Sequence, residues 1–241
     1  MKHLLQTIKN FTAPSCPTCP QATKGALGAC HIGQLGLLSE SKTSQVYSKG
    51  QVIYAEGGVC QGLHCLYQGK VKITKVGGDG KEQIIRLAKA GDLIGICALW
   101  GETNYRTSAV ALDDCRVCLL PRQDVLALVQ SNTQFAGALL KHLSLALNSS
   151  DQLALNMAYK PVRERLADAL LLLRQTYQEP DTTDFSMAIS RDDLASLVGT
   201  AKETASRLLS EFKEDGIVAA KGSHITILAP EKLVEISMQY A

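Results

Sequence analysis

The sequence contains no long apolar run. Its most apolar stretch, Leu166–Leu173, is far shorter than the roughly 20 residues that a membrane-spanning helix needs, and it includes Asp168. The first residues, MKHLLQTIKNF, lack the apolar core of a signal peptide. We therefore expect no membrane association and a cytoplasmic location, where cysteine thiols stay reduced.

A strong net charge is also lacking, because 25 Lys and Arg residues face 23 Asp and Glu residues. No overall basic or acidic character therefore points to a partner. The five histidines form neither an H-x-H nor an H-E-x-x-H motif, and no catalytic triad or phosphate-binding loop is evident. We expect no enzymatic activity. A barrel enzyme whose C-terminal region only mediates contacts is the alternative from a different class of protein.

Residues 45–120 show the alternation of apolar and polar residues that is typical of β-strands. The alternating stretches are QVIYAEGG, LHCLYQGKVKITKV, EQIIRLAKAGD and SAVALDDCRVCLL, and glycine-rich turns separate them. Short, evenly spaced strands with glycine turns predict a small antiparallel barrel or jelly roll.

From Gln123 the apolar period becomes helical, and no Gly or Pro interrupts residues 138–160. Pro161 ends this helix, because the residue before a proline avoids the α region. The helix carries an apolar stripe of Leu139, Leu143, Ala146, Leu147, Leu153 and Met157. The stripe fits packing against the helix's own barrel and packing against a twin helix in a dimer, and the sequence leaves both open.

The remaining residues predict three helices, a hairpin and a final short helix. The helices are expected over 163–177, 191–198 and 201–214, with a loop over 178–189 and two strands joined at Lys221-Gly222-Ser223. Ser190 is a plausible N-cap, and Thr200 with Glu203 forms a T-x-x-E capping box. This order is the outline of a winged helix-turn-helix.

The helix over 201–214 has two distinct faces when residues are placed about every 100°. One face carries Ala205, Leu208, Leu209 and Phe212, and the opposite face carries Glu203, Ser206, Arg207 and Ser210. Arg, Glu and Ser are side chains that read guanine and cytosine edges in the major groove. A solvated helix face is the plain alternative, and acidic residues outnumber basic ones in 161–241. Binding to DNA would therefore depend on local cations such as Lys202 and Arg207.

Barrel, long helix and winged helix, in this order, resemble the bacterial CRP/FNR regulators over nearly the whole chain. Two segments carry the resemblance, GDLIGICALWGETNYRTSAVAL in the barrel and KETASRLL in the third region. The resemblance implies an α+β fold with a cyclic-nucleotide-binding-like antiparallel β jelly-roll barrel, a long dimerisation helix and a C-terminal winged helix-turn-helix. We expect a cysteine-containing segment over 1–38, the barrel over 39–130, the helix over 131–160 and the DNA-binding domain over 161–241.

The resemblance also implies partners. The E-x-x-S-R pattern of the FNR subfamily falls on Glu203, Ser206 and Arg207, with Lys202 beside them. It implies that a homodimer binds palindromes of TTGAT-like half-sites in double-stranded DNA and contacts RNA polymerase. The expected dimer interface consists of Leu139, Leu143, Leu147, Asp151 and Met157. Asp151 would face its twin, and the two carboxylates would oppose dimerisation.

The effector pocket of the cyclic-AMP receptor protein is matched only in part. Arg106-Thr107 matches the pair that binds the cyclic phosphate, but Gly95 is followed by Ile96 instead of the glutamate that binds the ribose. A buried ribose hydroxyl without its partner costs about 1–3 kcal/mol. We therefore expect a structural role for Arg106, with a different anionic effector as the alternative.

Three of the eight cysteines lie within Ser15–Cys30. In FNR-type sensors three N-terminal cysteines and one barrel cysteine hold a 4Fe–4S cluster, which the resemblance carries onto Cys16, Cys19, Cys30 and Cys118. Zinc is an alternative, because Cys16-x-x-Cys19 and Cys115-x-x-Cys118 form a C-x₂-C pair of pairs. Residues three apart on a strand point to opposite faces, however, so Cys115 and Cys118 would need a bulge. Thiol–disulfide sensing and no metal at all are the remaining alternatives. Small buried core residues are the expected role of Cys60, Cys65, Cys97 and Cys115.

Overall fold

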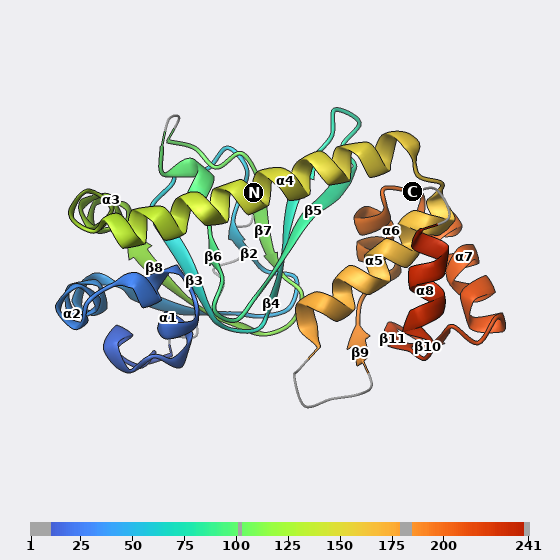
Figure 1. The fold of residues 1–241 in the computed structure, drawn as a ribbon, viewed down its shortest axis with the longest axis horizontal. Coiled ribbons are helices and arrows are strands. Elements are labelled where there is room, and N and C mark those ends of the chain that lie inside the picture. The colour runs from blue at the N-terminus through green and yellow to red at the C-terminus, as the bar shows by residue number, and fades with distance from the viewer. Residues whose placement is uncertain (1–10, 101–102, 179–184, 239–241) are drawn as a thin grey trace, which may run out of the picture. The chain divides into compact units, whose positions relative to one another are not determined.

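The computed structural model describes residues 11–100, 103–178 and 185–238. They form two compact units, one of Met1–Ile73 with Ala88–Leu147 and the other of Thr74–Leu87 with Asn148–Ala241. Each unit is described by itself (Figure 1). Within the described residues, no helix is both long and apolar enough to cross a lipid bilayer.

The N-terminal segment consists of short helices, which the sequence pattern does not predict. They are η1 (Cys16–Thr18), α1 (Pro20–Lys24), η2 (Ala26–Ala29) and α2 (Ile32–Ser41). Prolines stand in the first turns of η1 and α1, where their fixed φ suits a helix start. The α2 helix begins after His31, whose backbone N–H donates to Gln34 Oε1 at 3.0 Å.

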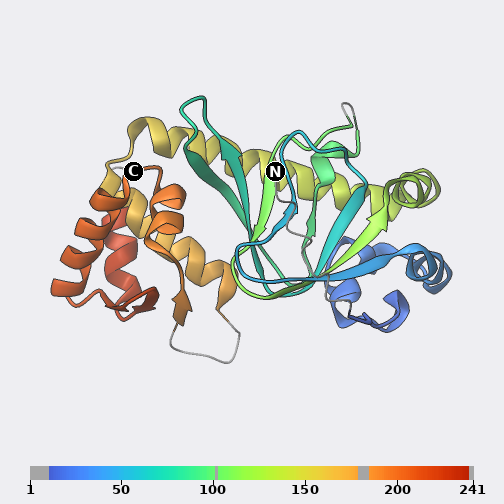
Figure 2. The ribbon, with the colours of Figure 1, turned by 180° about the vertical axis from the view of Figure 1, so that it is seen from behind.

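The barrel is an antiparallel double sheet, as predicted. One sheet has the order β1-β8-β3-β6 and the other β2-β7-β4-β5. The strands are β1 (Thr43–Tyr47), β2 (Val52–Tyr54), β3 (Gly62–Gln68), β4 (Lys70–Val76), β5 (Glu82–Lys89), β6 (Leu93–Ile94), β7 (Ser108–Ala111) and β8 (Cys115–Pro121), with η3 (Ile96–Ala98) after β6. The view from behind shows the strands of both sheets (Figure 2).

Three aromatic rings join the two sheets inside the barrel. Tyr54 of β2 stacks on Tyr105 with ring centroids 4.1 Å apart, and His64 of β3 lies 5.3 Å from Tyr54. The His64 side chain is 5% exposed, and burial lowers its pKa to about 4. The interior of the barrel at this point is therefore filled by side chains.

Two helices follow the barrel, α3 (Arg122–Ser131) and α4 (Thr133–Tyr159). Asn132 lies between them, and its Oδ1 accepts a hydrogen bond of 2.9 Å from the backbone N–H of Phe135. Its Nδ2 donates to Ala29 O at 3.0 Å and to Gln34 Oε1 at 2.8 Å. One side chain thus caps α4 and holds the N-terminal segment.

The C-terminal domain comprises α5 (Val162–Tyr177), β9 (Phe185–Ala188), α6 (Arg191–Val198), α7 (Lys202–Glu214), β10 (Val218–Lys221), β11 (His224–Ile227) and α8 (Pro230–Ser237). The predicted helices and hairpin are present. The prediction of a plain loop over 178–189 is wrong for Phe185–Ala188, which pairs with β11 as a third strand, and residues 179–184 lie outside the described residues. Phe185 and Met187 are buried in this strand, and the pattern of alternation was too short to identify it.

Two predictions of helix caps have different outcomes. Ser190 caps α6 as predicted, and its Oγ accepts from the backbone N–H of Asp193 at 2.9 Å. The capping box of Thr200 and Glu203 is wrong, because α7 starts after Ala201 without a side-chain cap. Gly199 takes a left-handed conformation with φ 69°, and this tight turn shifts the helix start past Thr200.

Candidate functional site

The thiols of Cys16 and Cys19 lie in the turns of the N-terminal segment. Cys16 is in η1 and is buried, and its backbone N–H donates to Ser39 Oγ of α2 at 3.1 Å. Cys19 is half-buried, and its backbone N–H donates to Cys16 O at 3.3 Å. The C-x-x-C motif is therefore a compact turn that α2 holds in place.

Cys118 of β8 lies in the same neighbourhood. Its thiol shares a hydrogen bond of 3.5 Å with Ser44 Oγ of β1. Burial raises the pKa of Cys118, Ser44 and Lys42 lower it, and the thiolates of Cys16 and Cys19 raise it further. The α2 helix packs against both η1, which carries Cys16, and β8, which carries Cys118, so one helix lies beside the C-x-x-C turn and the barrel strand.

Cys30 lies at the edge of this group. It is half-buried at the end of η2. Burial raises the pKa of its thiol to about 11, and the Cys16 thiolate contributes to the increase. Its backbone N–H donates to Leu27 O at 3.0 Å, which closes the turn of η2.

Cys115 does not share a site with Cys118. Its thiol donates to Lys70 O and Asp113 O, each at 3.3 Å, on the opposite side of the strand. Burial and then the Asp113 carboxylate raise the pKa of Cys115 to about 12. The C-x₂-C pattern of Cys115 and Cys118 therefore does not act as a chelating pair, as the alternation of the strand predicts.

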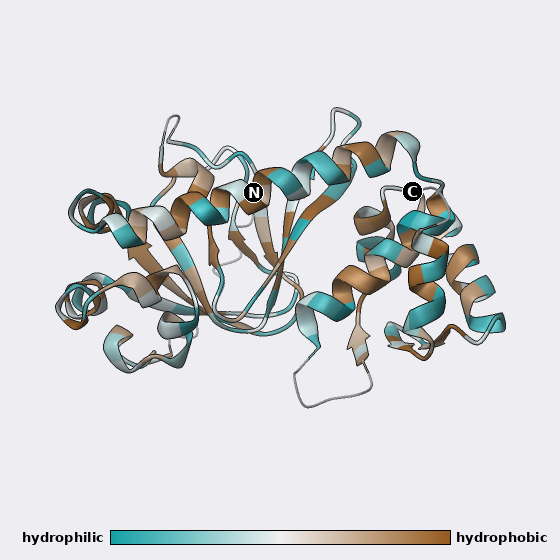
Figure 3. Ribbon diagram, in the orientation of Figure 1, coloured by the Kyte–Doolittle hydropathy of each residue, from teal (hydrophilic) through white to brown (hydrophobic). Residues whose placement is uncertain are grey.

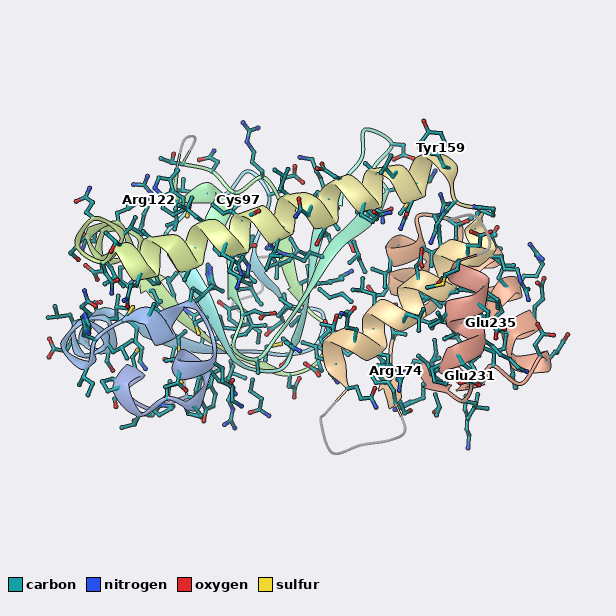
Figure 4. All side chains as sticks on the ribbon, in the orientation of Figure 1. Cys97, Arg122, Tyr159, Arg174, Glu231 and Glu235 are labelled. Carbon is teal, nitrogen blue, oxygen red and sulfur yellow. The ribbon has the colours of Figure 1, made fainter. Side chains whose placement is uncertain are left out.

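One of the remaining cysteines differs from the expectation of a small buried residue. Cys60 is buried as expected, but Cys97 is exposed, so its predicted core role is wrong (Figure 4). It lies in η3, where a turn of helix interrupts the strand pattern. Cys65 is buried as expected, and it is the register partner of Cys118 across β3 and β8. The sequence carries no signal for this pairing, because it does not fix which strands are neighbours.

The α7 helix has the two faces that the sequence predicts. Ala205, Leu208, Leu209 and Phe212 are all buried in the domain. On the other side Glu203 and Arg207 are exposed, and Ser206 is half-buried. Because Glu203 does not cap the helix, its carboxylate is available for another contact.

Ion pairs surround the exposed face of α7. Lys202 Nζ lies 2.7 Å from Asp192 Oδ2, and Arg207 pairs with Glu211. Glu211 also pairs with Arg163 at 2.9 Å. Exposed ion pairs of this kind contribute about 0–1 kcal/mol each. A lysine or arginine that leaves its carboxylate to bind a phosphate or a base therefore loses little free energy.

The three residues of the candidate effector pocket have different environments. Gly95 is buried with φ 86°, and a Cβ there would lie 3.2 Å from the ring of Tyr105. Thr107 is half-buried, whereas Arg106 is exposed. Aromatic side chains thus lie against Gly95, where the family's pocket would hold a ribose.

Some residues of the apolar stripe of α4 pack against their own chain, and others are exposed, as a dimer interface would require. Leu139 is 1% exposed and packs within its own unit, whereas Leu147 is 62% exposed. Leu143 is half-buried, and Met157 lies against Gly199, where its sulfur would be 2.6 Å from a Cβ. Leu139 and Met157 therefore pack against residues of their own chain and do not need a twin helix to cover them. Apolar and polar segments alternate along α4 (Figure 3).

Two family models match the chain. Residues 44–132 match the cyclic nucleotide-binding domain, and residues 164–236 match the Crp-like helix-turn-helix domain. The cyclic AMP receptor protein of Thermus thermophilus is 30% identical over 197 residues, which cover 82% of this chain and 89% of that protein. The chain belongs to the CRP/FNR family. It is a DNA-binding transcription regulator and not an enzyme, so the barrel-enzyme alternative falls.

Two further members of the family are similar over most of the chain. The fumarate and nitrate reduction regulatory protein of Vibrio cholerae is 28% identical over 222 residues, covering 86% of this chain and 88% of that protein. The solved structure of FixK2 from Bradyrhizobium japonicum has a TM-score of 0.73 at 26% identity, covering 83% of this chain and 99% of that one. The double sheet, long helix and C-terminal domain are thus the fold of this family.

Proposed function

We propose that this regulator responds to oxygen or redox state through a 4Fe–4S cluster held by its N-terminal cysteines and Cys118. The observation that carries the proposal is that α2 packs against both η1 and β8, which carry the buried Cys16 and Cys118 from positions about 100 residues apart in sequence. In the family's pattern Cys30 is the fourth thiol. When bound, the cluster supplies an oxygen-sensitive group.

The chemistry of the donors supports an iron–sulfur cluster. Cysteine thiolates are the ligands that hold such clusters, and four of them satisfy four irons. Cys16 and Cys118 are 5% and 7% exposed, which limits the access of water. Burial raises the pKa of Cys118, and the hydrogen bond with Ser44 and the positive charge of Lys42 offset part of this increase. The Lys42 Nζ also donates to Pro14 O, which holds the segment before Cys16.

A short path of contacts supports coupling between the cysteine segment and α4. Asn132 donates to Ala29 O, next to Cys30, and caps α4 through Phe135 N–H. A rearrangement of the N-terminal segment would change this hydrogen bond and the start of α4. We propose that α4 transmits the signal in this way.

The exposed face of α4 supports a homodimer. Leu140, Leu147 and Leu155 are 67%, 62% and 54% exposed. At 3.6 residues per turn these three leucines and Asp151 lie within about 80° of one another around the helix. Exposed apolar residues on one face fit a twin helix. The proposed interface thus keeps Leu147 and Asp151 from the sequence prediction, with Leu143 at its edge.

In the dimer each α7 would enter one half of a palindrome of TTGAT-like half-sites. Arg207, Glu203 and Ser206 would contact bases, and Lys202 would contact phosphate. RNA polymerase is the further partner that the family implies. Asp151 would lie near its twin, so dimerisation would depend on the state of the cysteine segment.

The test is a gel shift with a TTGAT-N₄-ATCAA duplex under nitrogen and after air. We expect tight binding under nitrogen and at least tenfold weaker binding after air. A duplex with both half-sites scrambled serves as the control. Binding that is equally tight before and after air, with reduced thiols throughout, would contradict oxygen or redox sensing. Binding that responds to zinc chelation but not to air would assign the cysteines to zinc.

A further inference from the structure

Cys65 and Cys118 form a directly opposed pair on neighbouring strands. Cys65 of β3 is the register partner of Cys118 of β8 in an antiparallel ladder. Opposed residues of such a ladder point to the same face, with Cβ atoms about 4.5–5.5 Å apart. The two thiols therefore leave the sheet side by side.

This pair points out of the barrel. His64, the neighbour of Cys65, contacts the rings of Tyr54 and Tyr105 between the two sheets. Because successive side chains of a strand alternate, Cys65 points to the outer face. A core role inside the barrel, the usual one for a buried cysteine, does not apply to this orientation.

The N-terminal segment covers that outer face. The Phe11 ring lies 5.8 Å from the ring of Tyr67 and 5.5 Å from the Arg116 guanidinium. Arg116 is two residues from Cys118 on β8 and shares its face, and Tyr67 lies at the register shift that follows Cys65 in β3. Cys65 and Cys118 are each only 7% exposed. The segment that carries Cys16 and Cys19 thus closes over the pair.

Electrostatic interactions support this arrangement. Burial and then the Cys118, Cys19 and Cys16 thiols together raise the pKa of Cys65 to about 12, and Lys42 opposes this increase. A 4Fe–4S cluster takes four thiolates, so a set that includes Cys65 leaves no place for Cys30.

We propose that Cys65 is a ligand of the metal centre and completes, with Cys16, Cys19 and Cys118, a set of four thiolates from which Cys30 is excluded. The centre would be held by one C-x-x-C turn and one cross-strand pair. The inference rests on the proposed function in that it takes the centre to be the iron–sulfur cluster.

The experiment compares single variants of the full chain, reconstituted with iron and sulfide under nitrogen. Cys65→Ser and Cys118→Ser should each retain several-fold less iron and acid-labile sulfide than the wild type. Cys30→Ser should keep the wild-type amounts. Cys60→Ser is the matched control, because Cys60 is a buried barrel cysteine whose thiol donates to Gly62 O. Cys65→Ala repeats the test with a side chain that tolerates burial.

Full iron and sulfide in Cys65→Ser together with their loss in Cys30→Ser would overturn the proposal. A second readout, the cobalt–thiolate absorption of the reduced metal-free protein after addition of Co²⁺, separates the site from the cluster. The wild type could take up no iron and still give a cobalt–thiolate band that Cys65→Ser lacks. This result would support the four-thiolate site and refute the iron–sulfur cluster. A band that Cys65→Ser leaves unchanged would refute the site.

Discussion

In the C-terminal domain one helix both anchors and presents its functional side chains, whereas the thiols of the N-terminal segment need partners from the barrel. The apolar face of α7 is buried in its own domain, and Arg207 projects from the opposite face. Cys16 instead lies in η1, and α2 packs against both this turn and β8, the strand of Cys118 about 100 residues further along the sequence. A site on one helix follows from local periodicity, but a site assembled from distant strands depends on register.

The largest difference between the two regions should appear in stability. Phe212 is fully buried in α7, with the Arg163 guanidinium 4.8 Å from the centre of its ring. Phe212→Ala should lower the free energy of unfolding by about 3–5 kcal/mol. Leu27→Ala in η2 is the comparison, and we expect a smaller loss because a short surface segment can close the cavity. Urea unfolding followed by circular dichroism measures the free energy of unfolding of both variants. Equal losses of free energy would contradict the expected difference between the two regions.

Loss of DNA binding should be the next largest effect. Arg207→Ala should weaken binding to the TTGAT palindrome at least about thirtyfold, because a bidentate contact to guanine is worth about 1–3 kcal/mol in each half-site. Arg174→Ala, near the end of α5, is the control and should bind as the wild type does (Figure 4). A gel shift under nitrogen measures the affinities. Unchanged binding by Arg207→Ala would show that this arginine does not read the DNA.

Acid should destabilise the barrel through His64. Its folded pKa of about 4 lies below the ordinary value of 6.5, so the unfolded chain binds the proton first. The contribution of neutral His64 to the free energy of unfolding is therefore fully present above pH 6.5 and is lost as the pH falls toward 4. About 2 kcal/mol of this free energy is lost between pH 7 and 5. Urea unfolding at both pH values measures the loss, and His64→Gln should reduce it. NMR signals of a His64 imidazole that is protonated at pH 6 would contradict this prediction.

The smallest effect concerns dimerisation. Asp151→Ala should increase the dimer fraction of cluster-free protein about threefold, because it removes the repulsion between two carboxylates on α4. Added salt should lessen the difference by screening it. Asp124→Ala on α3 is the matched control and should leave the monomer–dimer balance unchanged. Ultracentrifugation measures the balance, and an unchanged balance for Asp151→Ala would place this residue outside the interface.

The sequence predicts the fold well where periodicity is local. The faces of α7 and the cap at Ser190 are correct because helix geometry and a single hydroxyl determine them. The strand Phe185–Ala188 was missed, because four residues carry too little alternation and its pairing with β11 is a tertiary contact. The start of α7 was misplaced because the left-handed turn at Gly199 overrides the capping propensity of Thr200.

The thiol site could be predicted only in part. The motif Cys16-x-x-Cys19 is visible in the sequence, and the family resemblance adds Cys118. Cys65 could not be found in this way, because its place depends on the register of β3 and β8. Alternation correctly separates Cys115 from Cys118, but it does not say which neighbouring strand lies opposite either residue.

The most direct test is the content of iron, acid-labile sulfide and zinc in protein purified without oxygen, with its visible spectrum before and after air. We expect about four irons and four sulfides per chain and a brown colour that bleaches in air. Colourless protein that contains no iron and resists reconstitution would contradict it.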